Sequence, residues 1–187
     1  MSFILQECNK RINLFSDFKK NGLEKISLLA SIILKQISLG KKILIAGNGG
    51  SASESQHLSA ELMVKFKKTR NPISAICLSS DISLITACSN DFGYEFIFER
   101  QIEGIGKKGD ILILMTTSGK SNNIIKAAKL AKHKGLIVIS LTGINKTLLS
   151  KYSNYEIKIQ TKSTALIQEM HLFIIHTLCE ILEKKIK

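Results

Sequence analysis

The stretch Lys42–Glu61, KILIAGNGGSASESQHLSAE, decides the fold and supplies the first candidate site residues. It opens with the apolar run Ile43–Ala46, which suits a strand buried on both faces of a sheet. The glycine turn Gly47–Gly50 follows at once, and Ser51 begins a hydroxyl-rich helix. This order predicts an anion site, because glycines let the backbone approach a ligand and the N–H groups of the first helical turn point at it.

His57 and Glu61 share one face of this predicted helix, because they are four residues apart. Next to an anion site, they indicate a phosphorylated small molecule with acid/base or metal chemistry beside it. A His/Glu pair at this spacing is also common on solvated helix faces, and that alternative stays open at this point.

Working outward, apolar runs alternate with helical patterns. We expect strands over 43–46, 73–78, 110–115, 136–141 and 155–160, the last at a sheet edge. We expect helices over 3–18, 23–39, 51–66, a short one capped by Asp81, 94–103, one ending near 133, and 164–186. The alternation predicts an α/β fold, a three-layer αβα sandwich with a five-stranded parallel sheet. We expect one domain over 1–187, with a helical part at 1–40 that serves oligomerisation and an αβα core at 41–187.

Composition narrows the function classes. The 187 residues carry a formal net charge of +12 and are 44% hydrophobic, which argues against disorder. Lysines are spread along the chain, so no nucleic-acid partner is expected. The four cysteines lack metal spacing and are expected to be buried and reduced. With no signal peptide and no apolar run of membrane-spanning length in view, we expect a cytoplasmic protein with no membrane partner.

The glycine turn also fits the dinucleotide fingerprint G-x-G-x-x-G/A, through Gly47, Gly49 and Ala52. That fingerprint needs an acidic residue about 20 positions on, at the end of the second strand. The first candidate is Asp81, which lies some 30 residues past Gly50. A dinucleotide site is therefore the less favoured interpretation.

A second hydroxyl-rich loop, TTSGKS at 116–121, lies between a predicted strand and helix. Its hydroxyls and the following N–H groups can bind phosphate oxygens. Helix capping by Ser118 or Ser121 is the alternative. Both loops, and Asn90–Asp91, are expected beyond the carboxyl ends of the strands, where ligands bind in such sheets, and this favours phosphate binding.

The last predicted helix, IQEMHLFIIHTLCEIL, holds polar side chains that need partners in an apolar setting. His171 and His176 point about 140° apart and cannot serve one site. Gln168 and His176 are separated by a rise of about 12 Å, too far for two ligands of one metal on a straight helix. They can meet at one metal only from opposite sides or from different copies of the chain, so we expect the active site at a subunit interface.

Taken together, AGNGGSASESQH-x-x-x-E, SNDFGYEF, TTSGKS and IQEMHLFIIHTLCEIL resemble the phosphoheptose isomerases, which consist of a single sugar isomerase (SIS) domain. The resemblance implies an aldose–ketose isomerase, an intramolecular oxidoreductase that converts D-sedoheptulose 7-phosphate to D-glycero-D-manno-heptose 7-phosphate for the lipopolysaccharide core. It implies a homotetramer with one Zn²⁺ per subunit, bound by His57, Glu61, Gln168 and His176. The implied substrate-binding residues are Asn48, Gly49, Gly50, Ser51, Glu61, Asn90, Asp91, Thr116, Thr117, Ser118, Ser121 and Gln168.

For the chemistry, we expect Glu61 to act as base and His176 as acid/base, because isomerisation through an enediolate moves a proton between neighbouring carbons. One departure stands out: similar enzymes commonly have an arginine, sometimes after an aspartate, where this chain has Ala165 and Leu166. Lys162 is a candidate replacement. The rival hypothesis is a binding protein that resembles the DnaA initiator-associating protein, and His176 favours the enzyme over it.

Overall fold

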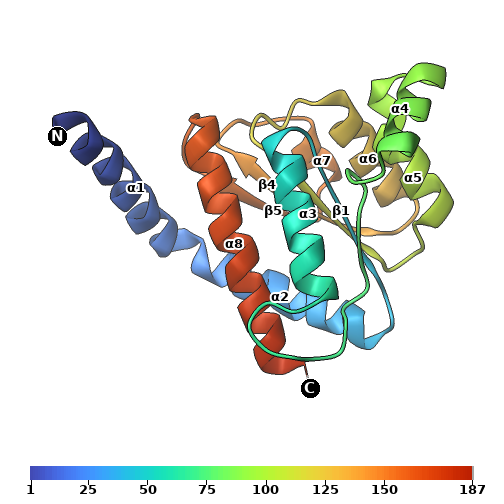
Figure 1. The fold of residues 1–187 in the computed structure, drawn as a ribbon, viewed down its shortest axis with the longest axis horizontal. Helices are drawn as coiled ribbons and strands as arrows, with labels where there is room; N and C mark the ends of the chain where they lie inside the picture. The colour runs from blue at the N-terminus through green and yellow to red at the C-terminus, as the bar shows by residue number, and fades with distance from the viewer. Residues whose placement is uncertain (187) are drawn as a thin grey trace.

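The computed structural model describes residues 1–186, apart from the side chain of Asn21, and forms a three-layer α/β/α sandwich (Figure 1). Its elements are α1 (Ser2–Asn21), α2 (Leu23–Ser38), β1 (Ile43–Gly47), α3 (Gly50–Met63), β2 (Ala75–Cys77), α4 (Ile82–Asp91), the 3₁₀ helix η1 (Tyr94–Phe96), α5 (Ile97–Ile105), β3 (Ile111–Thr116), α6 (Asn122–His133), β4 (Ile137–Gly143), α7 (Leu149–Tyr152), β5 (Tyr155–Ile159) and α8 (Thr164–Lys185).

The five strands form one parallel sheet in the order β2-β1-β3-β4-β5. The five-stranded parallel sheet predicted from the sequence is confirmed, and so is the edge position of β5. From β1 the chain crosses to β2, whereas from β3 it crosses to β4 in the opposite direction. The loops after β1 and β3 therefore diverge and leave a crevice between them, the usual ligand position in doubly wound sheets.

Strand side chains alternate between two separate cores. Ile43 and Ile45 face a core shared with α2, α3 and α8, while Leu44 and Ala46 face one shared with α5 and α6. All four are fully buried, as expected for a parallel strand covered on both faces. This confirms the sandwich and places α3 and α8 side by side on one face of the sheet (Figure 1).

Helix α1 extends away from the sandwich (Figure 1). Phe15 and Phe18 pack edge-on against Phe173 of α8, and Arg11 pairs with Glu169 at 2.6 Å. Other apolar side chains of α1 are exposed: Phe3, Ile4, Leu5 and Ile12. The structure thus confirms the two N-terminal helices and leaves an apolar surface on the first.

Several local expectations need correction. Asn90 and Asp91 end α4 rather than forming a turn, and β2 has only three residues. Helix α7 was not expected, and Cys8 is exposed whereas the other cysteines are buried. Asp81 caps α4, as expected, by accepting a hydrogen bond from the Leu84 N–H at 2.9 Å.

Helix α8 is long and apolar enough to cross a membrane, which the sequence analysis did not expect. Half of its apolar window is buried inside the fold, and the helix packs against α2 and α3. A helix in the core of a globular protein can be as long and as apolar as a membrane span. The packing of α8 against α2 and α3 identifies it as such a core helix.

Candidate functional site

The glycine turn is shaped by two positions where a side chain does not fit. Gly49 has a φ of +56°, a conformation that residues with a Cβ rarely adopt. At Gly50, an added Cβ would lie 2.3 Å from Nε2 of Gln168 in α8. The turn therefore brings bare backbone and the N-terminus of α3 to the crevice beside β3, as an anion site requires.

Asn48 of this turn is tied to two other loops. Its amide and that of Asn123 exchange two hydrogen bonds of 2.9 Å, and the Tyr94 hydroxyl donates to the same Asn48 oxygen at 2.9 Å. Asn123 is 2% exposed at the start of α6, while Tyr94 is exposed. The Asn48 oxygen thus already has two donors. Asn48 was predicted as a substrate ligand, and in this structure its side chain joins three loops.

The loop 116–121 after β3 lies at the same edge as the glycine turn. Thr116 and Ser118 accept hydrogen bonds from backbone N–H groups of their own loop, at 3.1 and 3.2 Å. Ser121 is the N-cap residue of α6, yet its side chain makes no capping bond. The capping alternative therefore does not account for Ser121, which remains a candidate phosphate ligand together with Thr117.

Asn90 and Asp91 lie apart from these contacts. Both are exposed, and the Asn90 amide donates to Asp91 Oδ1 at 2.9 Å. Asp91 lines a shallow hollow with Phe92 and Arg100 rather than with the glycine turn. Among the hydrogen bonds of residues 1–186, none joins this pair to another predicted site residue.

His57, Glu61 and His176 come together within one chain, between α3 and α8. Nε2 of His57 lies 2.8 Å from Nε2 of His176 and 3.5 Å from Oε1 of Glu61. The two imidazoles can share one proton at that distance, with one nitrogen donating and the other accepting. His57 and Glu61 are therefore not an isolated pair on a solvated helix face, because His176 of α8 contacts His57 and completes a group of three side chains. This group also needs no second copy of the chain to form.

Burial of the His176 ring lowers its pKa below the usual value, and the neighbouring His57 lowers it further. The Glu61 carboxylate opposes this shift of the His176 pKa but does not cancel it. His176 is consequently neutral at pH 7, the form that can accept or donate a proton and can bind a metal. His171 lies apart, as predicted, and faces Glu54 at 3.6 Å.

Gln168 lies at the other end of this surface, against Gly50. It lines an open groove of about 380 Å³ with Gly50, Glu54, Ala165, Glu169 and Leu172. Its eight-residue separation from His176 along α8 corresponds to a rise of about 12 Å. The structure thus separates Gln168 from the three residues that were predicted to share a metal with it.

The donor chemistry of His57, Glu61 and His176 suits zinc, since two imidazole nitrogens and a carboxylate oxygen are typical zinc ligands. Within residues 1–186, however, no group of three or more His, Cys, Asp or Glu side chains is arranged to hold a metal ion. The two imidazoles bond each other instead.

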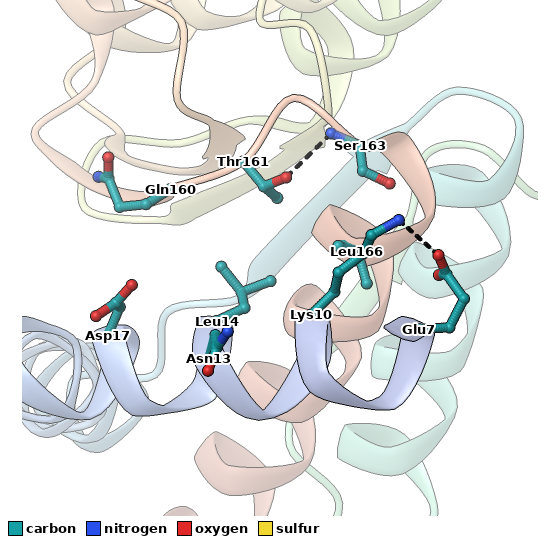
Figure 2. A pocket seen from close by; sticks show the side chains of 9 residues that line it. All are labelled: Glu7, Lys10, Asn13, Leu14, Asp17, Gln160, Thr161, Ser163 and Leu166. Atoms are coloured by element: carbon teal, nitrogen blue, oxygen red, sulfur yellow. Dashed lines mark hydrogen bonds and ion pairs between the residues drawn. The ribbon is translucent and has the colours of Figure 1, made fainter. Parts of the chain in front are cut away.

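The departure noted at Ala165 and Leu166 has a structural counterpart. Leu166 is 8% exposed and packs in the core, whereas Ala165 is exposed in the groove beside Gln168. Figure 2 shows Leu166 at a hollow of about 530 Å³ between α1 and the β5–α8 segment. None of the predicted site residues lines this hollow.

Sequence reasoning missed Tyr94, Asn123 and Phe66. The Phe66 ring stacks on the His176 imidazole, with centroids 5.2 Å apart and planes at 20°. The only signal for Tyr94 was its place in the SNDFGYEF stretch. Phe66 was expected at the end of the helix over 51–66, but α3 ends at Met63 and Phe66 lies in the loop that follows. Contacts over such sequence separations are visible only in the fold.

Both the sequence and the fold are similar to those of known proteins. The model of the SIS domain family matches residues 8–143. Phosphoheptose isomerase 1 of Campylobacter jejuni is 41% identical over 169 residues, which cover 90% of this chain and 89% of the relative. The structure of a phosphoheptose isomerase from Francisella tularensis matches with a TM-score of 0.94 at 32% identity, over 98% of this chain and 97% of that one. A phosphoheptose isomerase from Neisseria gonorrhoeae matches with a TM-score of 0.91 at 30% identity, over 98% of both chains.

Proposed function

Because this chain belongs to the SIS domain family and, within it, to the phosphoheptose isomerases, we propose that it converts D-sedoheptulose 7-phosphate to D-glycero-D-manno-heptose 7-phosphate. The observation that carries the proposal is the convergence of Glu61 and His176, with His57, between α3 and α8. The glycine turn at the start of α3 has the form that anion sites take. We further propose that the enzyme is cytoplasmic and supplies heptose for the lipopolysaccharide core.

In this reaction, Glu61 removes a proton from C1 of the ketose and the C–H electrons form a C1=C2 double bond, which turns the C2 carbonyl into an enediolate oxygen. A proton then moves from the C1 hydroxyl to the oxygen on C2, and one is returned to carbon C2, so that C1 becomes the aldehyde. A neutral His176 can relay the proton between the oxygens. General acid/base steps of this kind contribute about 10²–10⁴ in rate each.

We propose one Zn²⁺ per subunit at His57, Glu61 and His176, with Gln168 of a neighbouring chain as a fourth ligand, because Gln168 of the same chain lies about 12 Å along α8 from His176. The donor types support this proposal. A bound zinc would polarise the substrate carbonyl and stabilise the developing oxyanion.

We propose a homotetramer in which neighbouring subunits complete each site. Eleven residues of helix α3 separate Gly50 from Glu61, a rise of about 16 Å, which exceeds the length of a seven-carbon sugar phosphate. This separation supports a site in which the glycine turn of one chain and Glu61 of a neighbouring chain meet the same substrate molecule. The exposed apolar side chains of α1 support association between copies.

The test is isomerase activity on sedoheptulose 7-phosphate, with zinc content measured on the same purified protein. We expect Glu61→Gln and His176→Ala to lower kcat by about 10²–10⁴. The control is His133→Ala, an exposed position at the end of α6, which should leave kcat unchanged. Wild-type protein that is folded, metal-free and inactive would overturn the proposal and favour a binding protein.

A further inference from the structure

The segment that joins α3 to β2 is held by an acidic residue at the far end of α8. Glu183 is 5% exposed and accepts three backbone N–H groups: Phe66 at 2.7 Å, Lys67 at 2.9 Å and Lys68 at 3.0 Å. Burial alone would raise the pKa of Glu183, but these N–H groups and Arg70 outweigh it and hold the pKa below its usual value. A loop without regular structure is thus fixed at three consecutive residues.

Arg70 ties the same loop to the last turns of α3. Its Nε lies 3.5 Å from Glu183, and its terminal nitrogens donate to the backbone oxygens of Glu61 at 2.7 Å and Leu62 at 2.8 Å. The Arg70 side chain is 2% exposed. One buried ion pair therefore connects the end of α8, the loop, and the backbone of Glu61.

The loop delivers Phe66 to the face of His176. On one side the His176 ring stacks on Phe66, and it meets His57 edge-on with centroids 5.0 Å apart. A histidine ring turns easily about its terminal torsion, which has broad minima. Flat contact with Phe66 restricts that rotation, and so keeps Nε2 of His176 directed at His57.

We infer that Phe66 is a positioning residue for His176, and that Glu183 holds Phe66 in place. The effect on catalysis rests on the proposed isomerase function. The orientation of the His176 ring by Phe66 rests only on the contacts described above. Neither residue touches the proposed substrate loops, and neither belongs to the motifs that identified the family.

The test compares Phe66→Leu, Phe66→Tyr and Glu183→Gln, with Glu180→Gln as the matched control. Glu180 is on the same helix and is partly exposed, and it pairs with the side chains of Lys67 and Lys184 rather than with the backbone of the loop. Its loss is therefore expected to change kcat less than about twofold. Phe66→Leu should lower kcat about tenfold with KM within about twofold, because misplacing a catalytic group mainly affects the chemical step. Phe66→Tyr keeps the ring and should restore kcat, and Glu183→Gln should resemble Phe66→Leu.

A second readout does not depend on activity. In ¹³C-histidine-labelled protein, the ring protons of His176 should move downfield in Phe66→Leu, because the ring-current shift from the stacked phenyl is lost, and stay in place in Phe66→Tyr. Unchanged His176 resonances and unchanged kcat in Phe66→Leu would overturn the inference. Inactive wild-type protein would instead refute the proposed function. The His176 resonances would still decide whether Phe66 fixes the orientation of the His176 ring.

Discussion

Asn48 and Asn123 bond each other in both directions across 75 residues of sequence, and this pair joins the loop after β1 to the start of α6. We predict that Asn123→Ala raises KM for the sugar phosphate about tenfold, because the freed glycine turn loses its fixed orientation. The free energy of unfolding should fall by about 1–3 kcal/mol, since Asn48 loses a buried partner. Steady-state kinetics and urea unfolding test this. Exposed Asn122→Ala is the neighbouring control, and a wild-type KM in Asn123→Ala would contradict the prediction.

Gly50→Ala should impair the enzyme without unfolding it. The three atoms nearest the new Cβ all belong to the amide end of the Gln168 side chain, the closest at 2.3 Å, so that side chain must move away. We expect the free energy of unfolding to change by less than about 1 kcal/mol, because alanine favours the helix. Turnover and zinc content should both decrease. The control is Gly104→Ala in α5, where an added Cβ meets nothing within 4 Å; equal activity of the two variants would show that Gln168 has no part in the site.

A site shared between subunits predicts complementation. Gly50→Ala and Glu61→Gln should each be nearly inactive alone. Oligomers refolded from an equal mixture should regain up to about a quarter of the wild-type activity, because some sites then combine an intact glycine turn from one subunit with an intact Glu61 from the next. The activity of the mixture, measured against each variant alone, decides between the models. No recovery, with mixed oligomers verified by mass spectrometry, would mean that each chain builds its site alone.

Asp110 should make the fold sensitive to acid. Burial would raise the pKa of this carboxyl, but hydrogen bonds from the Lys42 ammonium and the backbone N–H groups of Lys107 and Lys42 hold it below the ordinary 3.8. A pKa lowered by folding contributes stability above the unfolded value, and that stability is lost as pH falls through the folded value. Asp110→Asn should therefore cost about 2–3 kcal/mol at pH 7. The difference should shrink as pH falls below 3.8, measured by urea unfolding; a gap that is constant with pH would contradict the prediction.

The fold was largely predictable because its strands are continuous apolar runs. Ile43–Ala46 and 110–115 agree with β1 and β3 to within one residue. The four-residue α7 has too few positions for a helical period to appear. Strand β2 begins at Ala75 rather than at 73, because the Ile73 N–H bonds to the Leu62 carbonyl rather than to a neighbouring strand. Local pattern fixes long elements and says little about short ones.

The site was predictable in composition but not in arrangement. Helical spacing put His57 beside Glu61, and the rise of α8 correctly separated Gln168 from His176. The approach of His176 to His57, 119 residues away, follows from the packing of α8 on α3. The sequence analysis argued for contacts between copies from Gln168 and His176, and it did not foresee that His57 and His176 meet within one chain. Asn48 likewise has neighbours that no spacing rule reveals.

The opposite crossovers from β1 and β3 carry a mechanical consequence. The glycine turn leads into a helix on one outer layer, and the TTSGKS loop leads into a helix on the other. An anion bound by both loops would link the two helical layers across the edge of the sheet. Any sliding of either layer over the sheet would then stretch the same few hydrogen bonds to the anion.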